Sequence, residues 1–290
     1  MKKIFLTGAT GNTGSQVVNQ LVKTNSQVTT LVQESSSETQ INKFEDYGFT
    51  VVKGDVLKSD TYENELSKAD VALLHVGNSE NQLDIEKSYI DTAKKSGLKH
   101  LVKFSAFRAD ENSPSEILAV HGKSENYIKN SSIPYTMVRP NFFMQNILMQ
   151  ADAIKTQNTF YLPLANTKVA TIDTRDVATF LSTVLTEKDH ENKTFEISGP
   201  EVISFHEMAK TLSEVLGRTI SFTPVSFEAF EASLKSLGLN DWSVNAFSGL
   251  NQYVENQDAM AYKTDDFETI TGKKPATFRQ FIEDHKDFFI

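Results

Sequence analysis

The sequence contains no cysteine among its 290 residues. A disulfide bond, a thiolate metal site and a cysteine nucleophile are therefore all excluded. No apolar stretch approaches the roughly 18 residues that a membrane-spanning helix needs. Acidic residues outnumber basic ones, which gives a formal net charge of -9, and lysine and arginine form no cluster. This charge distribution argues against a nucleic-acid partner.

The rest of the composition is that of an ordinary globular protein, with 39% hydrophobic and 23% charged residues. The length fits one α/β domain with an elaborated C-terminal portion, or two domains. Lys2 and Lys3 are followed by only a short apolar run, which predicts a first strand rather than a signal peptide. We therefore expect a cytoplasmic protein.

The most informative feature is that this apolar run ends in three glycines, Gly8, Gly11 and Gly14, spaced three residues apart. Residues 4–6 indicate a buried parallel strand, and residues 16–23 carry an apolar helical face. Glycine permits both a sharp turn and a close approach of the backbone. The free N–H groups at the start of such a helix favour anions, so we expect them to bind the pyrophosphate of a dinucleotide. A plain strand–helix turn is the alternative.

Strand-like and helix-like segments alternate beyond this turn. Strands are predicted at residues 27–32, 51–53, 71–75, 100–104 and 134–138, and helices at residues 39–47, 61–67, 83–96 and 116–130. This alternation predicts an α/β fold of the Rossmann type. We expect a doubly wound parallel sheet with ligands at the carboxyl ends of its strands.

The alternation becomes less regular after residue 140. Helices are predicted at residues 173–185, 204–216, 227–237 and 278–288, and a strand at residues 193–197. The helix at 204–216 begins with a capping box formed by Ser204 and Glu207 and stops at Gly217. We expect residues 1–140 to form an NAD(P)-binding Rossmann portion. Residues 141–290 are expected to form a smaller α/β lobe on the substrate side of a single compact unit.

Several motifs resemble those of the NmrA-like group of atypical short-chain dehydrogenases. They are Thr7-Gly8-Ala9-Thr10-Gly11-Asn12-Thr13-Gly14, Gly54-Asp55, residues 171–178, residues 197–201, Leu216-Gly217-Arg218 and Gly272-Lys273-Lys274-Pro275. The likeness extends over essentially the whole chain and is strongest to the bacterial quinone oxidoreductase type 2 and triphenylmethane reductase branch. Members of that branch reduce quinones or aromatic dyes with a nicotinamide cofactor. The resemblance therefore implies NADP(H) or NAD(H) as the cofactor and a small aromatic or quinone-like substrate.

The strand ends and the resemblance together give a set of candidate cofactor-binding residues: Gly8, Thr10, Gly11, Asn12, Thr13, Gly14, Gln33, Asp55, Val56, His75, Gly77 and Pro140. The family pattern has a basic residue at Gln33, where it would pair with the 2′-phosphate of NADP. Gln33 can hydrogen-bond either ribose, and Glu34 would repel a 2′-phosphate if it pointed inward. The choice between NADP(H) and NAD(H) therefore stays open. We expect Asp55 to accept from the adenine amino group, or alternatively to cap the turn after Gly54.

The usual proton donor of short-chain dehydrogenases is absent from this sequence. That donor is a tyrosine followed four residues later by lysine, and none of the eight tyrosines has this spacing. Tyr127 is followed at that offset by Ser131, and Tyr135 by Arg139. Hydride transfer would then depend mainly on proximity and stacking.

The segment His121-Gly122-Lys123-Ser124-Glu125 stands where that donor would be expected. The related reductases carry a similar His-x-x-Ser/Thr-Glu segment. His121 and Ser124 share one helical face, and we expect His121 to titrate near neutral pH and to protonate the reduced substrate. Lys123 could reach the cofactor, and Ser105 is expected to face the nicotinamide. The alternatives are a packing or capping histidine, a solvated lysine and a serine that caps a strand end.

Asn141, Phe142 and Phe143 follow the sixth predicted strand and are candidate substrate-binding residues. Aromatic side chains at that edge would stack on a flat aromatic substrate. Such a run is equally typical of a hydrophobic core.

Other chemistries lack their motifs. His206-Glu207 has no second histidine four residues on, and neither a Gly-x-Ser-x-Gly elbow nor a nucleoside-triphosphatase phosphate loop is present. We expect no metal, no nucleic acid and no membrane as partners, and an oligomer is compatible with the sequence. The favoured hypothesis is an NAD(P)H-dependent reductase of quinone-like or aromatic acceptors. The alternative is a non-catalytic NAD(P)-binding redox sensor, whereas an epimerase or dehydratase would need the missing tyrosine.

Overall fold

The computed structural model describes residues 1–290. The chain forms two compact units, each built from several segments. The first unit comprises Met1–Asn112, Val120–Arg139 and Val177–Phe195, and the second comprises Ser113–Ala119, Pro140–Asp176 and Glu196–Ile290. The chain therefore leaves the first unit at Ser113, at Pro140 and at Glu196, and returns to it at Val120 and at Val177. No helix combines the length and the apolar character that a membrane span requires.

Seven strands form the main sheet in the order β3-β2-β1-β4-β5-β6-β9. They are β1 (Lys2–Leu6), β2 (Ser26–Val32), β3 (Thr50–Lys53), β4 (Val71–Leu74), β5 (Leu101–Phe104), β6 (Tyr135–Pro140) and β9 (Lys193–Ile197). All pairs from β3 to β6 are parallel. The strand order reverses between β1 and β4, which is where doubly wound folds bind their ligands. The predicted Rossmann-type fold is confirmed.

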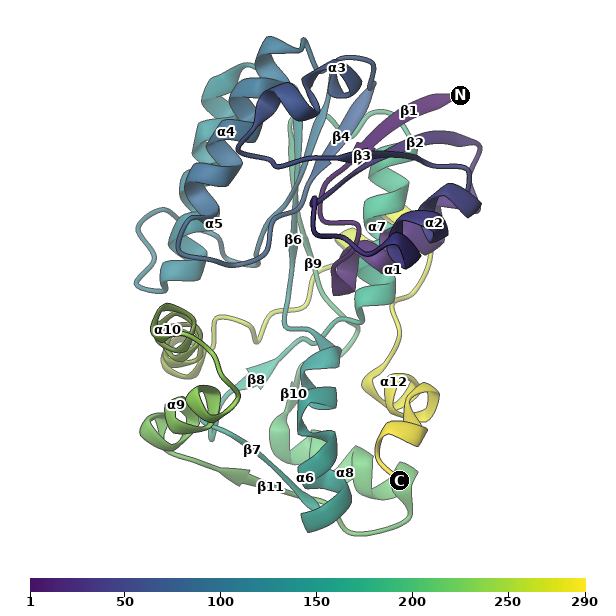
Figure 1. Ribbon diagram of the computed structural model, residues 1–290. Helices are drawn as coiled ribbons and strands as arrows, with labels where there is room; N and C mark the ends of the chain where they lie inside the picture. The colour runs from purple at the N-terminus through teal and green to yellow at the C-terminus, as the bar shows by residue number, and fades with distance from the viewer. The chain divides into compact units, whose positions relative to one another are not determined.

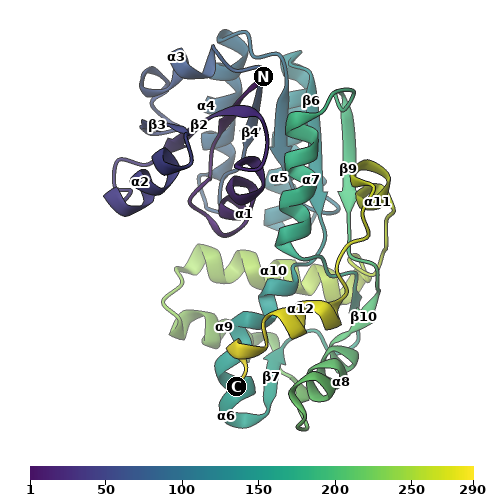
Figure 2. The same cartoon turned by 90° about the vertical axis from the view of Figure 1, so that its right-hand side faces the viewer.

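The helices of this sheet are α1 (Asn12–Leu21), α2 (Glu38–Asp46), α3 (Glu63–Leu66), α4 (Gln82–Lys95), α5 (Glu116–Ser131) and α7 (Thr174–Thr186), with a 3-10 turn η1 (Ser59–Thr61). Helices α1 and α7 lie on one face of the sheet, and α4 and α5 lie on the other (Figures 1 and 2). The predicted helix at 61–67 is interrupted at Tyr62, whose φ is -138°. The Tyr62 ring is buried and stacks on Tyr89 with ring centroids 5.8 Å apart. This packing stabilises the chain more than a continuous helix through Tyr62 would.

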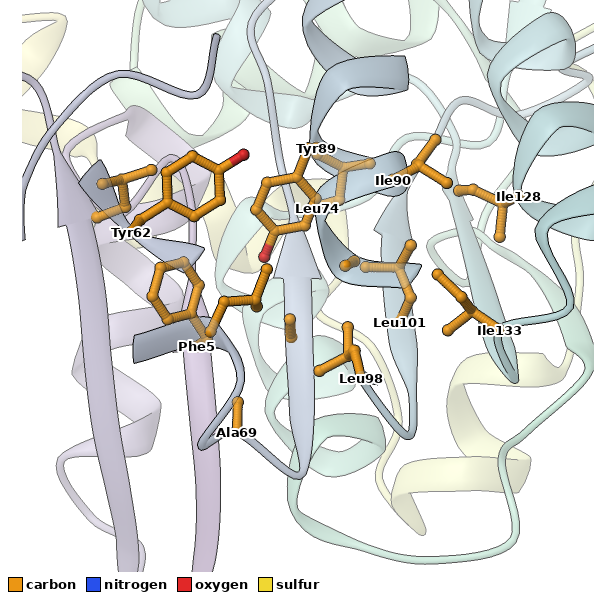
Figure 3. Close-up of a cluster of buried hydrophobic side chains, with 14 of the residues drawn as sticks. Phe5, Tyr62, Ala69, Leu74, Tyr89, Ile90, Leu98, Leu101, Ile128 and Ile133 are labelled. Carbon is orange, nitrogen blue, oxygen red and sulfur yellow. The ribbon is translucent and has the colours of Figure 1, made fainter. Parts of the chain in front are cut away.

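One hydrophobic cluster of the first unit lies between the sheet and helices α4 and α5. Phe5 from β1, Leu74 from β4 and Leu101 from β5 project towards Tyr89 and Ile128 in this layer (Figure 3). These strands are short apolar runs without alternation because the residues of a central parallel strand are buried on both faces. A rigid layer of this kind fixes the strand ends, on which the candidate site depends.

The second unit contains two small sheets. In one, β7 (Thr159–Leu162) runs parallel to β11 (Ser221–Pro224), and in the other β8 (Lys168–Val169) runs antiparallel to β10 (Ile203–Ser204). Its helices are α6 (Ala151–Gln157), α8 (Phe205–Leu216), α9 (Phe227–Ser236), α10 (Asp241–Gln257), α11 (Asp266–Thr271) and α12 (Phe278–Asp284), with 3-10 helices η2 (Met144–Gln150) and η3 (Lys286–Phe288). Helix α9 lies against α10, and α12 lies against α8 (Figure 2).

Two sequence predictions for the second unit can be compared directly with the structure, and one helix was not predicted. The capping box of α8 is confirmed, because the Ser204 hydroxyl accepts from the Glu207 N–H at 3.2 Å and the Glu207 carboxylate accepts in return at 2.7 Å. The predicted helix at 278–288 is too long, since α12 ends at Asp284 before the short turn η3. Helix α10 was not predicted, because its sequence includes several Ser and Asn residues and one Gly, which are weak helix formers.

Candidate cofactor and active site

The glycine turn between β1 and α1 is held by two close backbone approaches. Gly8 has a φ of +70°, and a Cβ at this position would lie 2.5 Å from the carbonyl oxygen of His75. A Cβ on Gly14 would collide with the carbonyl oxygen of Gly8. Both positions therefore require glycine for the fold itself.

Gly11 differs from its two neighbours in the motif. Its φ is -76°, which any residue adopts, and a Cβ would meet only the Gly8 carbonyl oxygen at 3.4 Å. Gly11 is also exposed. Nothing in the protein itself requires a glycine at this position, so the open space in front of it fits a ligand that approaches the backbone closely.

The amides at the start of α1 lack protein acceptors. The first N–H groups of any α-helix have no intrahelical partner, and the N-cap Gly11 has no side chain to accept from them. The Gly11 N–H itself donates to the Gly8 carbonyl at 3.1 Å, which leaves Asn12, Thr13 and Gly14 to present their N–H groups. Thr10 and Asn12 are exposed, whereas Thr13 is buried. This arrangement fits the pyrophosphate of a dinucleotide.

The residues expected near the adenosine lie at the ends of β2 and β3. Gln33 is exposed directly after β2, and the Ser35 hydroxyl approaches its amide oxygen at 3.5 Å. Asp55 is exposed after β3, and its carboxylate accepts from the Leu57 N–H at 3.0 Å, which is the turn-capping contact. The half-buried Val56 accepts through its carbonyl from the Tyr62 hydroxyl at 3.0 Å.

His75 joins the glycine turn to the end of β4. The backbone N–H of His75 donates to the Thr7 hydroxyl at 2.8 Å. The His75 ring stands edge-on to Phe104, with ring centroids 4.5 Å apart. Burial lowers the pKa of His75 to about 4, and nearby Lys103 acts in the same direction. Nδ1 of this neutral ring is buried without a partner. Gly77 follows two residues later, is exposed and has open space around it.

His121 lies on the buried side of α5, against the end of β5. Its Nδ1 is 3.2 Å from the Nζ atom of Lys103, a fully buried lysine that also forms an ion pair with Glu86 of α4 at 2.7 Å. Burial, followed by Lys103, lowers the pKa of His121 well below 6.5. The expectation that His121 titrates near neutral pH is therefore wrong for the free protein, because a charged imidazole would be desolvated beside a cation.

The neighbours of His121 on α5 point in different directions. Ser124 is fully buried, and its hydroxyl has no hydrogen-bond partner. Lys123 is exposed. The structure therefore brings His121 and Ser124 to the same buried side of the helix and turns Lys123 towards solvent.

Ser105 belongs to a second buried polar group, separate from the one that Lys103 forms with Glu86 and His121. Its hydroxyl donates to Glu125 at 2.6 Å, and Arg139 donates to the same carboxylate through Nε at 2.8 Å and Nη2 at 2.6 Å. The Glu125 side chain is 1% exposed, so this bidentate pair compensates a buried charge.

Asn141, Phe142 and Phe143 lie in the second unit, directly after Pro140 at the buried end of β6. The Asn141 amide donates to the carbonyl oxygens of Met260 at 3.2 Å and Tyr262 at 3.3 Å, which ties this loop to a distant segment of the same unit. Phe142 packs edge-on against Phe205 at 5.9 Å. Phe142 and Phe143 are both half-buried.

Comparison with known proteins identifies the family to which this chain belongs. The model of the NmrA-like family matches residues 1–282. The chain belongs to the NmrA-like family. The predicted resemblance is therefore confirmed, and the match extends over nearly the whole chain.

This NmrA-like protein has relatives of matching length. The NAD(P)H azoreductase of Xenophilus azovorans is 29% identical over 286 residues, which cover 99% of both chains. Quinone oxidoreductase 2 of Escherichia coli (strain K12) is 28% identical over 242 residues, covering 82% of this chain and 83% of the relative. The solved structure of the Escherichia coli NADPH-dependent quinone oxidoreductase complexed with NADPH has a TM-score of 0.88 at 23% identity, covering 98% and 99%. The last likeness shows that the fold is shared.

Sequence reasoning gave no role to four charged residues of this NmrA-like protein: Glu86, Lys103, Glu125 and Arg139. One signal was available. Lys103 interrupts the apolar run of β5, and a lysine in a central parallel strand is almost never buried without a partner. Its partners could not be identified, because they come from α4 and α5, far along the chain.

Proposed function

We propose that this protein is an NAD(P)H-dependent reductase that transfers hydride to a quinone-like or aromatic acceptor. The observation that carries the proposal is the glycine turn at the switch point between β1 and β4. Close backbone contacts require glycine at Gly8 and Gly14. Gly11 instead leaves open space in front of the unpaired N–H groups at the start of α1. The names of the azoreductase and the quinone oxidoreductase support the same reaction class.

The residues around this turn fit the parts of a nicotinamide dinucleotide. The amides of Asn12, Thr13 and Gly14 would hold the pyrophosphate, and Gln33 would lie at the adenine ribose. His75 and Gly77, at the end of the neighbouring strand, would border the nicotinamide half. The dinucleotide would therefore lie along the carboxyl ends of β2, β1 and β4.

The proposed chemistry needs a hydride source and a group that stabilises the reduced acceptor. The bound nicotinamide supplies the hydride. His121, neutral and almost fully buried, would donate a hydrogen bond to the acceptor oxygen as that oxygen gains charge. Asn141, Phe142 and Phe143 stay predicted substrate-binding residues.

The test is oxidation of NADPH and of NADH, measured separately against a panel of benzoquinones, naphthoquinones, azo dyes and triphenylmethane dyes. Turnover with at least one acceptor class is expected, with one acceptor reduced per cofactor oxidised. Tight cofactor binding without turnover on any acceptor would favour the redox sensor. Absence of binding to either cofactor would overturn both functions.

A further inference from the structure

The buried amino group of Lys103 has all three of its N–H donors in use. It donates to the Glu86 carboxylate at 2.7 Å, to its neighbour's carbonyl oxygen on Phe104 at 2.9 Å, and to Nδ1 of His121 at 3.2 Å. An ammonium group has three donors and no acceptor. The contact with His121 can therefore form only if Nδ1 is unprotonated and accepts.

This contact determines where the proton of the His121 ring resides. A neutral imidazole carries one proton, and if Nδ1 accepts, that proton must be on Nε2. Nε2 has no hydrogen-bond partner in the protein, and it is not among the fully buried atoms that lack one. The ring therefore presents an available Nε2–H donor, held in one orientation by a buried lysine.

We propose that Lys103, held by Glu86, is a positioning residue that fixes His121 as an Nε2–H donor to the substrate oxygen and replaces the donated proton at Nδ1. This inference rests on the proposed reductase function for its catalytic part. The lysine acts only through His121 and makes no contact of its own with the reacting atoms.

The proton balance explains why the lysine is needed. A quinone ring that has accepted a hydride carries a negative oxygen and needs one proton. A neutral imidazole that simply lost its Nε2 proton would become an imidazolate, which is far too basic to form at neutral pH. Transfer of a Lys103 proton to Nδ1, as the Nε2–H bond breaks and the substrate O–H bond forms, keeps His121 neutral throughout. Lys103 is left as a neutral amine beside Glu86. Nε2 then takes a proton from water and Nδ1 returns its proton to Lys103, which restores the starting tautomer.

The groups around His121 act together to keep the imidazole neutral. Burial lowers its pKa, and Lys103, His75 and Arg139 act in the same direction. A doubly protonated ring would also lose the contact with Lys103, because Nδ1–H cannot accept. The cluster thus favours one tautomer of the neutral ring rather than the imidazolium.

The first test measures the tautomer directly in the cofactor-free protein. Long-range nitrogen–proton NMR on protein with labelled histidines distinguishes Nδ1–H from Nε2–H, and His121→Ala assigns the signal. The inference expects His121 to be neutral and Nε2-protonated at neutral pH. A charged ring or the Nδ1–H tautomer in the wild-type protein would overturn it.

The second test removes the donor without leaving a buried charge unpaired. Lys103→Met alone would strand Glu86, and Glu86→Gln alone would strand Lys103, so the two substitutions are combined and compared with the wild-type protein. The wild-type protein is expected to show the Nε2–H tautomer. The double variant is expected to show a mixture of tautomers, with the signals of His100 unchanged as an internal control.

The kinetic comparison uses the same two proteins. The double variant should have a kcat at least about tenfold below that of the wild type, while the KM for NADPH changes by less than about twofold. An unshifted tautomer or an equal kcat would mean that Lys103 is structural only, and the proposal would fail. A wild-type protein that turns over no acceptor would refute the reductase, and with it the catalytic part of this inference, whatever the NMR tautomer shows.

Discussion

A Cβ on Gly14 would collide with the carbonyl oxygen of Gly8, whereas the same atom on Gly11 would meet that oxygen only at van der Waals distance. The two outer glycines of the motif are thus required by the backbone contacts of the turn. The middle glycine is not, and the space beside it is open to a ligand. This difference separates the fold requirement from the binding requirement within a single loop.

The first prediction concerns that middle glycine. Gly11→Val should fold as the wild type does, because its backbone angles suit any residue, but its branched side chain would occupy the pyrophosphate position. We expect NADPH affinity to fall at least about a hundredfold, about 2.7 kcal/mol, in calorimetric titration. Gly249→Val is the control, because Gly249 also has open space but lies in α10. Unchanged affinity in folded Gly11→Val would remove the cradle from the proposed site.

The second prediction concerns the choice of cofactor. Because Gln33 offers no charge to a 2′-phosphate, NADPH should be preferred over NADH by about tenfold or less in kcat/KM, equivalent to about 1.4 kcal/mol. Gln33→Arg should shift the preference further towards NADPH through a charge-assisted contact. Gln27→Arg adds the same charge at an exposed position of β2 and should leave the ratio unchanged. A wild-type preference above about a thousandfold would place the determinant elsewhere.

The third prediction concerns His121. His121→Ala should lower kcat by about a hundredfold or more, with NADPH affinity nearly unchanged, since the ring acts on the acceptor. Because its pKa lies well below 6.5, His121 should impose no titration on kcat/KM between about pH 6 and 8. His206→Ala, at an exposed position of α8, should keep full activity. Full activity of His121→Ala, with about 1 kcal/mol lost from the unfolding free energy, would make His121 a packing residue.

The fourth prediction concerns stability in acid. His100 donates through Nε2 to the Thr136 hydroxyl at 2.8 Å, and its Nδ1 is buried without a partner. Burial lowers its folded-state pKa from 6.5 to about 4, so the unfolded chain binds the proton first as the pH falls. The contribution of His100 to the free energy of unfolding is therefore fully present above pH 6.5. It is lost progressively as the pH falls from 6.5 to about 4.

The measurement is urea unfolding at a series of pH values. His100→Gln should lose roughly 3 kcal/mol less than the wild type between these two pH values, as the size of the shift implies. A remaining loss is expected from His75 and His121, whose pKa values are also lowered. His206→Gln serves as the control. Parallel pH profiles for wild type and His100→Gln would show that the pKa of His100 is the same in the folded and unfolded states, which would contradict this prediction.

Much of the fold could be predicted because its signals are local. The parallel strands were found from apolar runs. Helix α8 begins after Ser204 and ends at Gly217, whose φ is +68°, as its capping residues predict. The interruption at Tyr62 was missed because it depends on stacking against Tyr89, which is 27 positions later in the printed sequence. Helix α10 was missed because Ser, Asn and Gly, which are weak helix formers, are scattered along its sequence.

The sequence by itself determined the glycine turn, the strand that precedes it and the helix that follows, since each depends on neighbouring residues. It also indicated His121 as a candidate, although the titration expected of that residue was wrong. Only the tertiary structure decided that Gly11 is open while Gly14 is closed, because the colliding oxygen belongs to a backbone folded back on itself. It also decided the tautomer of His121, because Lys103 and Glu86 arrive from different elements and become strong partners only when all three are removed from water.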